Sequence, residues 1–375
     1  MATVQGECQD RFEPLRVQLD AALADGSEAG LSVCAIADGE VLVDLWGGVA
    51  DVDSGTTWER DTVVNVFSVT KTMTALAALL LVERSELDLD APVAKYWPEF
   101  AAGGKDVVLV RHLLGHTSGV AGWQRRVSLA DVYDTCAAAD LLAAQEPWWE
   151  PGTASGYHAM NQGHLVGELV RRLTGQSLGV FFRAEIADPL DVDFHIGTPP
   201  AVDERVAVLI TPGAPSALGS LPPESLTVRT LGNPVLDLAA VRGTTWRRAE
   251  LGAMNGHGNA RSVARAQSVI SHGGRGLLGD ATIARIFDVQ ADGVDQVLGT
   301  SVRFGTGYAL GHPAFAAHAG RACWWTGFGG TLVVNDLDRR LTIAYVMNKM
   351  APGVINVERG AAYVRAIYAA LDGSR

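Results

Sequence analysis

Positive charge is scarce in this sequence. Its 375 residues include 30 Lys and Arg against 42 Asp and Glu, which gives a net charge of -12, and only four residues are lysine: Lys71, Lys95, Lys105 and Lys349. Proteins that bind DNA or RNA gather Lys and Arg along the phosphate backbone. The sequence therefore argues against a nucleic-acid partner.

Cysteines are few, and long hydrophobic runs are absent. The four cysteines (Cys8, Cys34, Cys136, Cys323) are widely spaced and form no C-x-x-C pair, so we expect reduced thiols in a cytoplasmic protein. Residues 1–16 are mostly polar and do not resemble a secretory signal. No run of eighteen apolar residues predicts a membrane span. Zinc-ligand spacing, a P-loop and a dinucleotide fingerprint are absent as well, so we expect neither a metal nor a cofactor.

The pattern of hydrophobic residues predicts an α+β fold. Strand-like runs occur near both ends of the chain and helical patterns in the middle, and a helix that is apolar nearly all round, Met73–Glu83, belongs in the core. We therefore expect an antiparallel sheet built from both chain ends and flanked by helices. Residues 1–80 and 250–375 would form this α/β domain, and residues 81–249 a mainly helical inserted lobe. Within the lobe, the Pro- and Gly-rich segment 198–243 is predicted to be irregular and to border a pocket. The strands expected are Gly30–Ile36, Glu40–Leu45, Gly305–Gly311, Ala322–Thr326, Gly330–Val334 and Leu341–Met347.

Ser68-Val69-Thr70-Lys71 is an S-x-x-K motif at the start of the apolar helix. Two residues three positions apart on a helix lie on the same face, so the Lys71 amine can reach the Ser68 hydroxyl. Burial and the positive end of the helix dipole both favour a neutral amine. A serine nucleophile without a histidine needs such a base. The motif is short, however, and arises by chance in many sequences.

Two further segments carry groups suited to the same chemistry. Tyr157 follows a Pro-Gly turn, and a tyrosine beside a lysine is expected to lose its proton more easily and to act as a general base. Trp325-Thr326-Gly327 ends a predicted strand, where glycines let backbone N–H groups approach a ligand. Each segment also has a purely structural interpretation: a packed tyrosine in the first case, and a bulged aromatic strand in the second.

Together these segments resemble the serine β-lactamase and penicillin-binding-protein superfamily, and within it the family VIII carboxylesterases. The resemblance extends over nearly the whole chain, because further motifs occur in the order typical of that family. They are residues 111–119 (RHLLGHTSG), 163–168 (GHLVGE), 174–179 (TGQSLG) and 344–348 (AYVMN).

The resemblance implies a role for each part of the site. Ser68 would be the nucleophile, Lys71 and Tyr157 its activating pair, and the backbone N–H groups of Ser68 and Phe328 the oxyanion hole. Trp325-Thr326-Gly327 would replace the Lys-Thr-Gly motif of β-lactamases, and Ala159 stands where their tyrosine motif has asparagine. An indole in place of a cation favours neutral esters over β-lactams. We predict that substrate is contacted by Trp325, Thr326, Gly327, Trp324, Trp123 and His158.

The resulting hypothesis is a serine carboxylesterase that hydrolyses a small-molecule ester, short-chain or bulky and aromatic, through an acyl-enzyme. Alternatives on the same site are a β-lactamase, a D,D-peptidase or amidase, an acyltransferase, and an inactive binding protein. A Ser-His-Asp triad using His112, His116 or His158 remains open. Ser177, in a G-x-S-x-G match, more plausibly caps a helix. The sequence does not distinguish a monomer from a homodimer.

Overall fold

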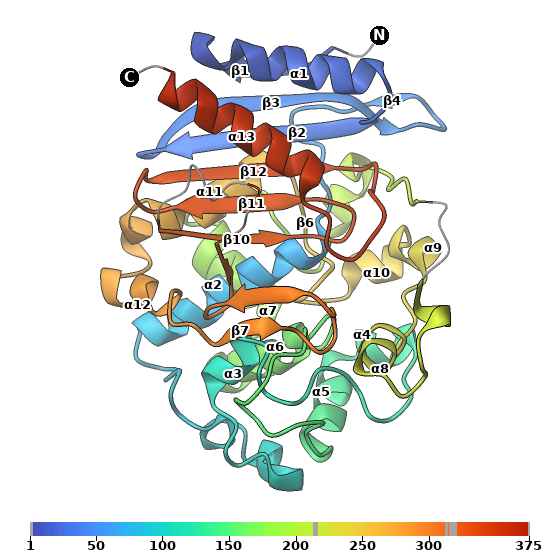
Figure 1. Cartoon of the computed structure of the whole chain (residues 1–375), viewed down its shortest axis with the longest axis vertical. Helices are drawn as coiled ribbons and strands as arrows, with labels where there is room; N and C mark the ends of the chain where they lie inside the picture. Colours follow the sequence, from blue (N-terminus) through green and yellow to red (C-terminus); the bar gives the residue numbers. More distant parts are fainter. Residues whose placement is uncertain (1–2, 213–216, 312–313, 315–320, 374–375) are drawn as a thin grey trace.

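One antiparallel sheet is built from the two ends of the chain, as predicted (Figure 1). The computed structural model describes residues 3–212, 217–311, 314 and 321–373. The order of strands in the sheet is β1-β3-β2-β12-β11-β10-β9-β8-β7, and β4 pairs with β3. Leu31 of β2 pairs with Met347 of β12, which joins the first part of the chain to the last. The strands are β1 (Gln5–Cys8), β2 (Gly30–Ala37), β3 (Glu40–Asp51), β4 (Thr56–Thr57), β7 (Ala291–Val294), β8 (Ser301–Phe304), β9 (Ala309–Leu310), β10 (Ala322–Thr326), β11 (Leu332–Asp336) and β12 (Leu341–Met347).

Helices cover both faces of the sheet. On one face lie α1 (Glu13–Ala24) and α13 (Glu358–Asp372), and the Tyr368 hydroxyl of α13 donates to Asp336 of β11 at 3.0 Å. On the other face lies α11 (Ala260–Ser271), where Gln267 accepts a hydrogen bond from Asn335 of β11 at 3.3 Å. The central helix α2 (Thr70–Glu83) is buried from Thr70 to Leu81, as its apolar sequence requires.

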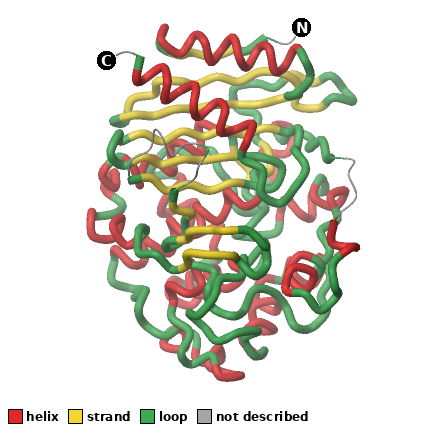
Figure 2. Tube along the Cα trace, viewed as in Figure 1, coloured by secondary structure: helices red, strands yellow, loops and turns green. Residues whose placement is uncertain are grey.

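The chain between the two halves of the sheet is mainly helical (Figure 2). Helix α2 continues past residue 80, and the boundaries proposed for the inserted lobe stay a prediction. The helices of this part are α3 (Val110–Leu114), α4 (Leu129–Tyr133), α5 (Thr135–Ala144), α6 (Gln162–Thr174), α7 (Leu178–Phe182), α8 (Leu226–Leu231), α9 (Leu238–Val241) and α10 (Thr244–Arg248). The helix α12 (Asp280–Arg285) and the short pair β5 (Val64–Asn65) and β6 (His257–Gly258) belong to the flanking regions.

Segment 198–243 is less irregular than its composition predicts. It contains α8 and α9, which begin at the side-chain caps Ser225 and Asp237, together with 3-10 turns at Pro200–Arg205 and Ala217–Ser220. Serine and aspartate accept hydrogen bonds from the first free N–H groups of a helix, so even a short helix can form after them. Residues 213–216 of this segment lie outside the described residues.

Three parts of the sheet differ from the prediction. Strand β1 and the β7–β8 hairpin were not predicted, because their residues are mostly exposed and polar and give no alternating apolar pattern. The predicted strand Gly305–Gly311 is reduced to Ala309–Leu310. The turn Asp38-Gly39, in contrast, has positive φ at both residues (50° and 81°), as a two-residue hairpin turn requires.

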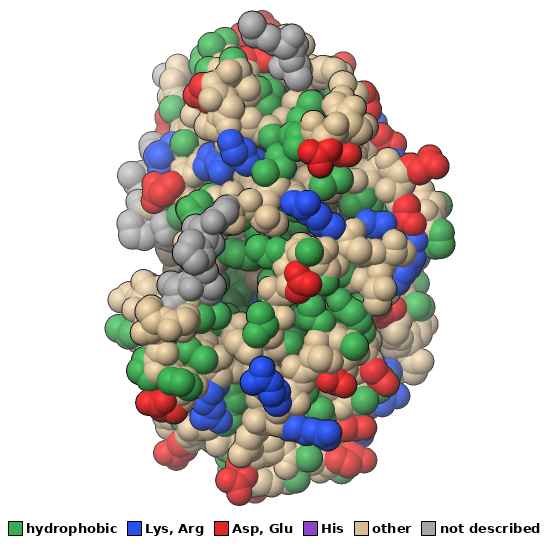
Figure 3. Space-filling model, turned by 90° about the vertical axis from the view of Figure 1, so that its right-hand side faces the viewer, with side chains coloured by type: hydrophobic (Ala, Val, Ile, Leu, Met, Phe, Trp, Pro, Cys, Tyr) green, Lys and Arg blue, Asp and Glu red, His purple; other side chains and the backbone are tan. Residues whose placement is uncertain are grey.

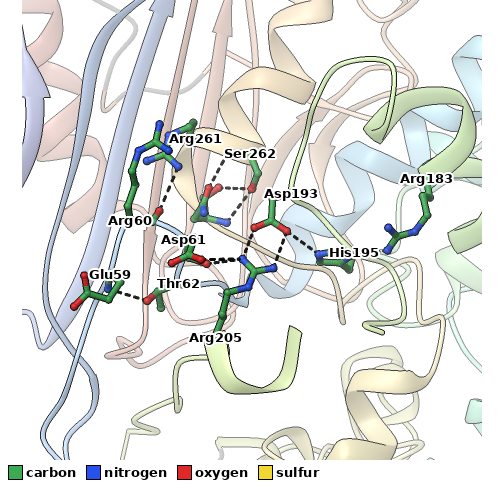
Figure 4. A network of polar contacts seen from close by, with 11 residues as sticks. Glu59, Arg60, Asp61, Thr62, Arg183, Asp193, His195, Arg205, Arg261 and Ser262 are labelled. Carbon is green, nitrogen blue, oxygen red and sulfur yellow. Dashed lines mark hydrogen bonds and ion pairs between the residues drawn. The ribbon is translucent and has the colours of Figure 1, made fainter. Parts of the chain in front are cut away.

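A polar network ties the segment after α7 to the start of the chain (Figure 4). Asp193 accepts hydrogen bonds from Arg205 at 2.6 Å and from His195 at 2.8 Å, and Arg205 also donates to the backbone oxygen of Asp61 at 2.7 Å. Within the described residues, no helix has the length and hydrophobicity needed to cross a bilayer.

Candidate active site

The nucleophile lies on a strained turn in front of α2. Phe67–Val69 form one turn of 3-10 helix, and Phe67 has a φ of 44°. A bulky residue at positive φ is unfavourable and is found where surrounding structure imposes it. This turn places Ser68 at the entrance of α2, with the Ser68 side chain in contact with two groups that can exchange protons with it.

Lys71 is the first of these groups. Its Nζ lies 3.3 Å from Ser68 Oγ and donates to the backbone oxygens of Ala159 at 2.7 Å and Ala253 at 2.9 Å. Burial lowers the pKa of Lys71 well below its usual value. A neutral amine has two hydrogens and one lone pair. In the neutral form, hydrogen bonds to the two carbonyl groups would use both hydrogens, and the lone pair could accept the Ser68 proton.

Tyr157 is the second group, and its hydroxyl donates to Ser68 Oγ at 2.8 Å. The side chain of Trp325 lies beside the phenol and lowers the pKa of Tyr157, but burial has the larger effect. The expectation that Lys71 makes Tyr157 more acidic is wrong. Burial is the largest cause and raises the pKa of Tyr157 above its usual value, and the negative charge of Asp295 raises it further. Tyr157 therefore stands ready as a proton donor.

Trp325 lies in an aromatic cluster against the tyrosine. Its ring centroid lies 6.2 Å from Tyr157, 5.6 Å from His116 and 5.5 Å from Phe304. The side chain is 5 % exposed. Where the resemblance to β-lactamases implies a lysine, this chain has an apolar wall.

The end of β10 brings a second backbone N–H toward Ser68. A Cβ on Gly327 would lie 2.2 Å from the Val66 backbone oxygen, so only glycine allows this approach. The next residue, Phe328, packs its ring against Phe67. The backbone amides of Ser68 and Phe328 are thus brought to the same end of α2, and their role as an oxyanion hole stays a prediction.

The structure separates the other residues predicted to bind substrate. Trp324 points to the opposite face of the sheet from Trp325, the face covered by α13, because neighbouring strand residues alternate. Thr326 shares that face, and its hydroxyl donates to the Thr331 backbone oxygen at 2.9 Å. Trp123 is 2 % exposed and donates to the Ala138 backbone oxygen at 2.9 Å, inside the helical part. Trp324 and Trp123 are therefore not placed to contact a substrate at Ser68.

His158 supports the site from behind. It is completely buried; its Nδ1 bonds the Gly156 backbone oxygen at 2.7 Å and its Nε2 lies 2.6 Å from Ser118 Oγ. Burial lowers the pKa of His158 to about 4, so the ring is neutral at neutral pH. Both ring nitrogens of His158 are hydrogen-bonded within the protein, so His158 is not placed to contact the substrate.

The two alternatives to this site, a catalytic Ser177 and a histidine triad, do not match the structure. Ser177 caps α7 by accepting a hydrogen bond from the Val180 N–H, and its hydroxyl donates to Glu250 at 2.8 Å, which confirms the predicted cap. Among the described residues, the side-chain partners of Ser68 Oγ are Lys71 and Tyr157. No histidine takes part, so this geometry does not form a Ser-His-Asp triad.

Three residues pack against the site, and the sequence suggested only His116 among them, as a candidate triad histidine. His116 is buried against Tyr157 and Trp325, Phe304 contacts both His116 and Trp325, and Asp295 accepts a hydrogen bond from the Tyr157 N–H at 3.1 Å. Only His116 had a local signal, since it lies within the motif 111–119. Phe304 and Asp295 belong to the unpredicted β7–β8 hairpin.

The surroundings of the site are apolar rather than metal-binding. On the side of the molecule where α8, α9 and α10 lie, the surface is hollowed, and hydrophobic side chains line the hollow (Figure 3). Among the described residues, no group of three or more His, Cys, Asp or Glu side chains is arranged to hold a metal ion. A separate open groove of about 1030 Å³ lies beside β1 and β3 and is lined by paired charges such as Asp44 and Arg261; Ser68 does not line it.

Comparisons with known proteins agree with this geometry. Esterase/beta-lactamase LipL of Mycobacterium tuberculosis is 37 % identical over 283 residues, which cover 72 % of this chain and 65 % of LipL. The chain thus spans less than two thirds of this curated relative. A crystal structure of a family VIII carboxylesterase superposes with a TM-score of 0.91 at 35 % identity, covering 98 % of this chain and 99 % of that one. A penicillin-binding protein homologue from Caulobacter crescentus superposes with a TM-score of 0.90 at 34 % identity, and it covers the same shares of the two chains.

The match to a protein family is equally extensive. The family model described as Beta-lactamase matches residues 17–366, which include the nucleophile turn, the tyrosine segment and β10. The fold and the arrangement of Ser68, Lys71 and Tyr157 are those that the sequence motifs led us to expect. The chain belongs to the beta-lactamase family.

Proposed function

We propose that this protein is a serine carboxylesterase that hydrolyses neutral esters through an acyl-enzyme on Ser68. One observation carries the proposal: two groups that can exchange protons meet at Ser68 Oγ. The Tyr157 hydroxyl donates to Ser68 Oγ at 2.8 Å, and Lys71 Nζ lies 3.3 Å from the same atom. Burial lowers the pKa of Lys71, which favours the neutral amine that can accept the serine proton.

Acylation begins with attack of Ser68 Oγ on the ester carbonyl. The serine proton passes to Lys71, and the Ser68 and Phe328 N–H groups stabilise the negative charge that forms on the carbonyl oxygen. As the C–O bond of the ester breaks, Tyr157 gives its proton to the leaving alcohol oxygen. The Lys71 ammonium then returns a proton to Tyr157, so both groups recover their starting states.

Deacylation follows the same route with water in place of the serine. Lys71 removes a proton from water, and the hydroxide attacks the acyl carbonyl. The oxyanion forms again between the two N–H groups. When the bond between Ser68 and the acyl group breaks, the proton held by Lys71 returns to Ser68 and the carboxylic acid product leaves. No residue outside the trio Ser68, Lys71 and Tyr157 has to exchange a proton.

The walls of the site favour neutral esters over β-lactams. Trp325 presents an indole where the resemblance implies a lysine for the β-lactam carboxylate, and Ala159 lacks an amide. Aromatic walls bind neutral acyl groups through apolar contact. The second candidate is β-lactam hydrolysis, because LipL carries both activities in its name and the penicillin-binding homologue superposes almost as well. An amidase or an acyltransferase would use the same trio.

The proposed partner is a small-molecule ester, without a cofactor, a nucleic acid or a membrane. We place the enzyme in the cytoplasm, and four unpaired cysteines support this location. Two of them, Cys34 and Cys323, are fully buried, and burial raises the pKa of both thiols. They are therefore inert at neutral pH and do not compete with Ser68 as nucleophiles.

A pair of serine variants tests the proposal. Ser68→Ala should reduce hydrolysis of p-nitrophenyl butyrate by more than about a thousandfold and abolish labelling by a fluorophosphonate. Ser177→Ala is the matched control, since Ser177 caps a helix and should leave both signals intact. Nitrocefin turnover faster than ester turnover would favour the β-lactamase alternative. A rate that rises with added alcohol would favour acyl transfer, and activity that survives Ser68→Ala would refute the mechanism.

A further inference from the structure

Asp295 is a buried carboxylate that is bonded to the tyrosine segment. It lies in the loop of the β7–β8 hairpin and is completely buried. Its Oδ1 accepts hydrogen bonds from the N–H groups of Tyr157 at 3.1 Å, Val297 at 2.9 Å and Leu298 at 2.9 Å. Its Oδ2 accepts from the Ser155 hydroxyl. A single side chain thus joins its own loop to residues 155 and 157.

All four partners of this carboxylate are donors. Three backbone N–H groups and one hydroxyl satisfy an ionised carboxylate, which has only acceptor sites. No ion pair links Asp295 to a Lys or Arg among the residues that the structure describes. The negative charge is therefore held beside Tyr157 by neutral dipoles and is not cancelled by a cation.

Burial disfavours the charged forms of the basic groups around Tyr157. Lys71 lies 4.9 Å from the Tyr157 ring centre, and burial lowers its pKa. His116 lies 5.0 Å from that centre, and burial lowers its pKa too. His158 follows Tyr157 in the chain, and its pKa of about 4 leaves it neutral. The negative charge of Asp295 acts in addition to burial, because it also opposes formation of a tyrosinate.

The same hairpin also supports the other side of the site. Phe304, at the end of β8, packs against Trp325 at 5.5 Å and against His116 at 5.1 Å. The backbone N–H of Gln296, next to Asp295, donates to the Ser155 oxygen at 2.9 Å. One hairpin therefore contacts both the tyrosine and the tryptophan that packs against it.

We propose that Asp295 is the positioning residue of Tyr157: its carboxylate fixes the 155–157 turn, and its negative charge adds to the effect of burial in disfavouring a tyrosinate beside Ser68. This inference rests on the proposed esterase function, because it assigns the task of general base to Lys71 and that of proton donor to Tyr157. Asp295 does not touch substrate. It acts through the orientation and the proton affinity of the residue it holds.

Two substitutions separate geometry from charge. Asp295→Asn keeps an oxygen for the three N–H groups and removes the charge, so kcat should change by less than about tenfold. The fall in kcat/KM at alkaline pH should move to lower pH by more than about half a unit, because the negative charge that disfavours a tyrosinate has been removed. Asp295→Ala removes the bonds as well, and kcat should fall by roughly a hundredfold with KM little changed.

Asp336→Asn is the matched control. Asp336 is also a buried carboxylate that accepts from a tyrosine hydroxyl and a backbone N–H, but it lies on the α13 face of the sheet. This variant should lose thermal stability and keep the wild-type pH profile of kcat/KM. A folded Asp295→Asn variant with the wild-type profile, together with a folded Asp295→Ala variant of wild-type kcat, would overturn the proposal.

A spectroscopic titration keeps the test independent of activity. The ultraviolet absorbance of tyrosinate, taken as the difference between a protein and its Tyr157→Phe counterpart, reports the ionisation of Tyr157 alone. This ionisation should occur at lower pH in Asp295→Asn than in the wild type. A wild type that hydrolyses no ester and takes no fluorophosphonate would refute the esterase, whereas equal Tyr157 titrations would refute only the role of Asp295. If the Asp295 variants do not fold, Ser155→Ala carries the test: a lower kcat supports the role, and an unchanged kcat refutes it.

Discussion

The ring of Phe328 packs edge-on against the ring of Phe67, with centroids 5.4 Å apart and planes at 72°. Phe67 immediately precedes Ser68, and Phe328 carries the other amide of the proposed oxyanion hole. The contact therefore couples the spacing of the two backbone donors to the packing of two side chains. Because oxyanion stabilisation depends on donors placed within a few tenths of an ångström, this packing matters for catalysis.

Substituting Phe328 should weaken catalysis without removing a donor. In Phe328→Leu the backbone N–H remains but its support is smaller, so kcat should fall by about five- to twentyfold. Phe182→Leu is the control, because Phe182 forms a similar edge-on pair with Phe194 away from Ser68. It should cost about 1–2 kcal/mol of stability with kcat unchanged. Equal kcat values for the two variants would show that the packing of the aromatic pair does not affect the oxyanion hole.

Trp325→Phe should isolate the polar effect of the indole on Tyr157. Phenylalanine keeps much of the aromatic contact and has no N–H, so the effect by which Trp325 lowers the pKa of Tyr157 is lost. We expect kcat for p-nitrophenyl butyrate to fall by about three- to tenfold. A pH profile of the variant provides a second readout, because loss of the indole N–H should make the phenol less acidic. A rise in kcat would indicate that the indole restrains Tyr157 instead.

The two buried lysines should respond differently to the same substitution. Lys71 and Lys105 both donate to backbone carbonyl groups, Lys105 to that of Ala143 at 2.9 Å. Lys71→Met should reduce the rate of fluorophosphonate labelling by at least about a thousandfold, since the base is lost. Lys105→Met should label normally and should lose about 2–4 kcal/mol of stability in urea unfolding, because several carbonyl groups lose their donor. Normal labelling of the Lys71 variant would exclude it as the base.

Buried histidines predict an acid-sensitive fold. His257 is completely enclosed, and burial lowers its pKa to about 3, from a usual value of 6.5. Below pH 6.5 the unfolded chain takes up a proton that the folded protein refuses until its own pKa is reached. The free energy of unfolding should therefore fall as the pH drops from about 6.5 to about 4, by roughly 1–3 kcal/mol for each such histidine.

The variant His257→Asn tests this origin. Its amide can still donate to the Asn255 backbone oxygen, which accepts from His257 Nδ1 at 2.7 Å, and it cannot be protonated. Urea unfolding between pH 7 and pH 4 should show a flatter dependence on pH than in the wild type. Parallel curves for the two proteins would assign the acid sensitivity to other groups.

Much of the site could be predicted because its motifs are local. Ser68 and Lys71 share one helix turn, and the order of Tyr157 and Trp325 in the chain matches that of a known family. Two consecutive tryptophans were both predicted to bind substrate, yet alternation along a strand allows only one of Trp324 and Trp325 to face the site. The register of β10 decides between them, and that register depends on distant pairing with β11.

Other features had no local signal. The positive φ of Phe67 arises from the packing around the turn, and nothing in the residue type predicts it. Asp295 reaches Tyr157 across a large separation in sequence, from a hairpin whose exposed residues show no apolar alternation. The pKa of Tyr157 was predicted to shift in the wrong direction, because the degree of burial is a property of the folded site.

The pairing of β2 with β12 has a consequence for synthesis. Leu31 can find its partner Met347 only after nearly the whole chain has left the ribosome. At roughly 5–20 residues per second, the edge of β2 then waits for tens of seconds without a neighbour, and contacts so distant in sequence also form slowly. The nascent protein therefore exposes an apolar strand edge for longer than most domains of its size. We expect its yield in cells to depend on chaperones that shield such edges.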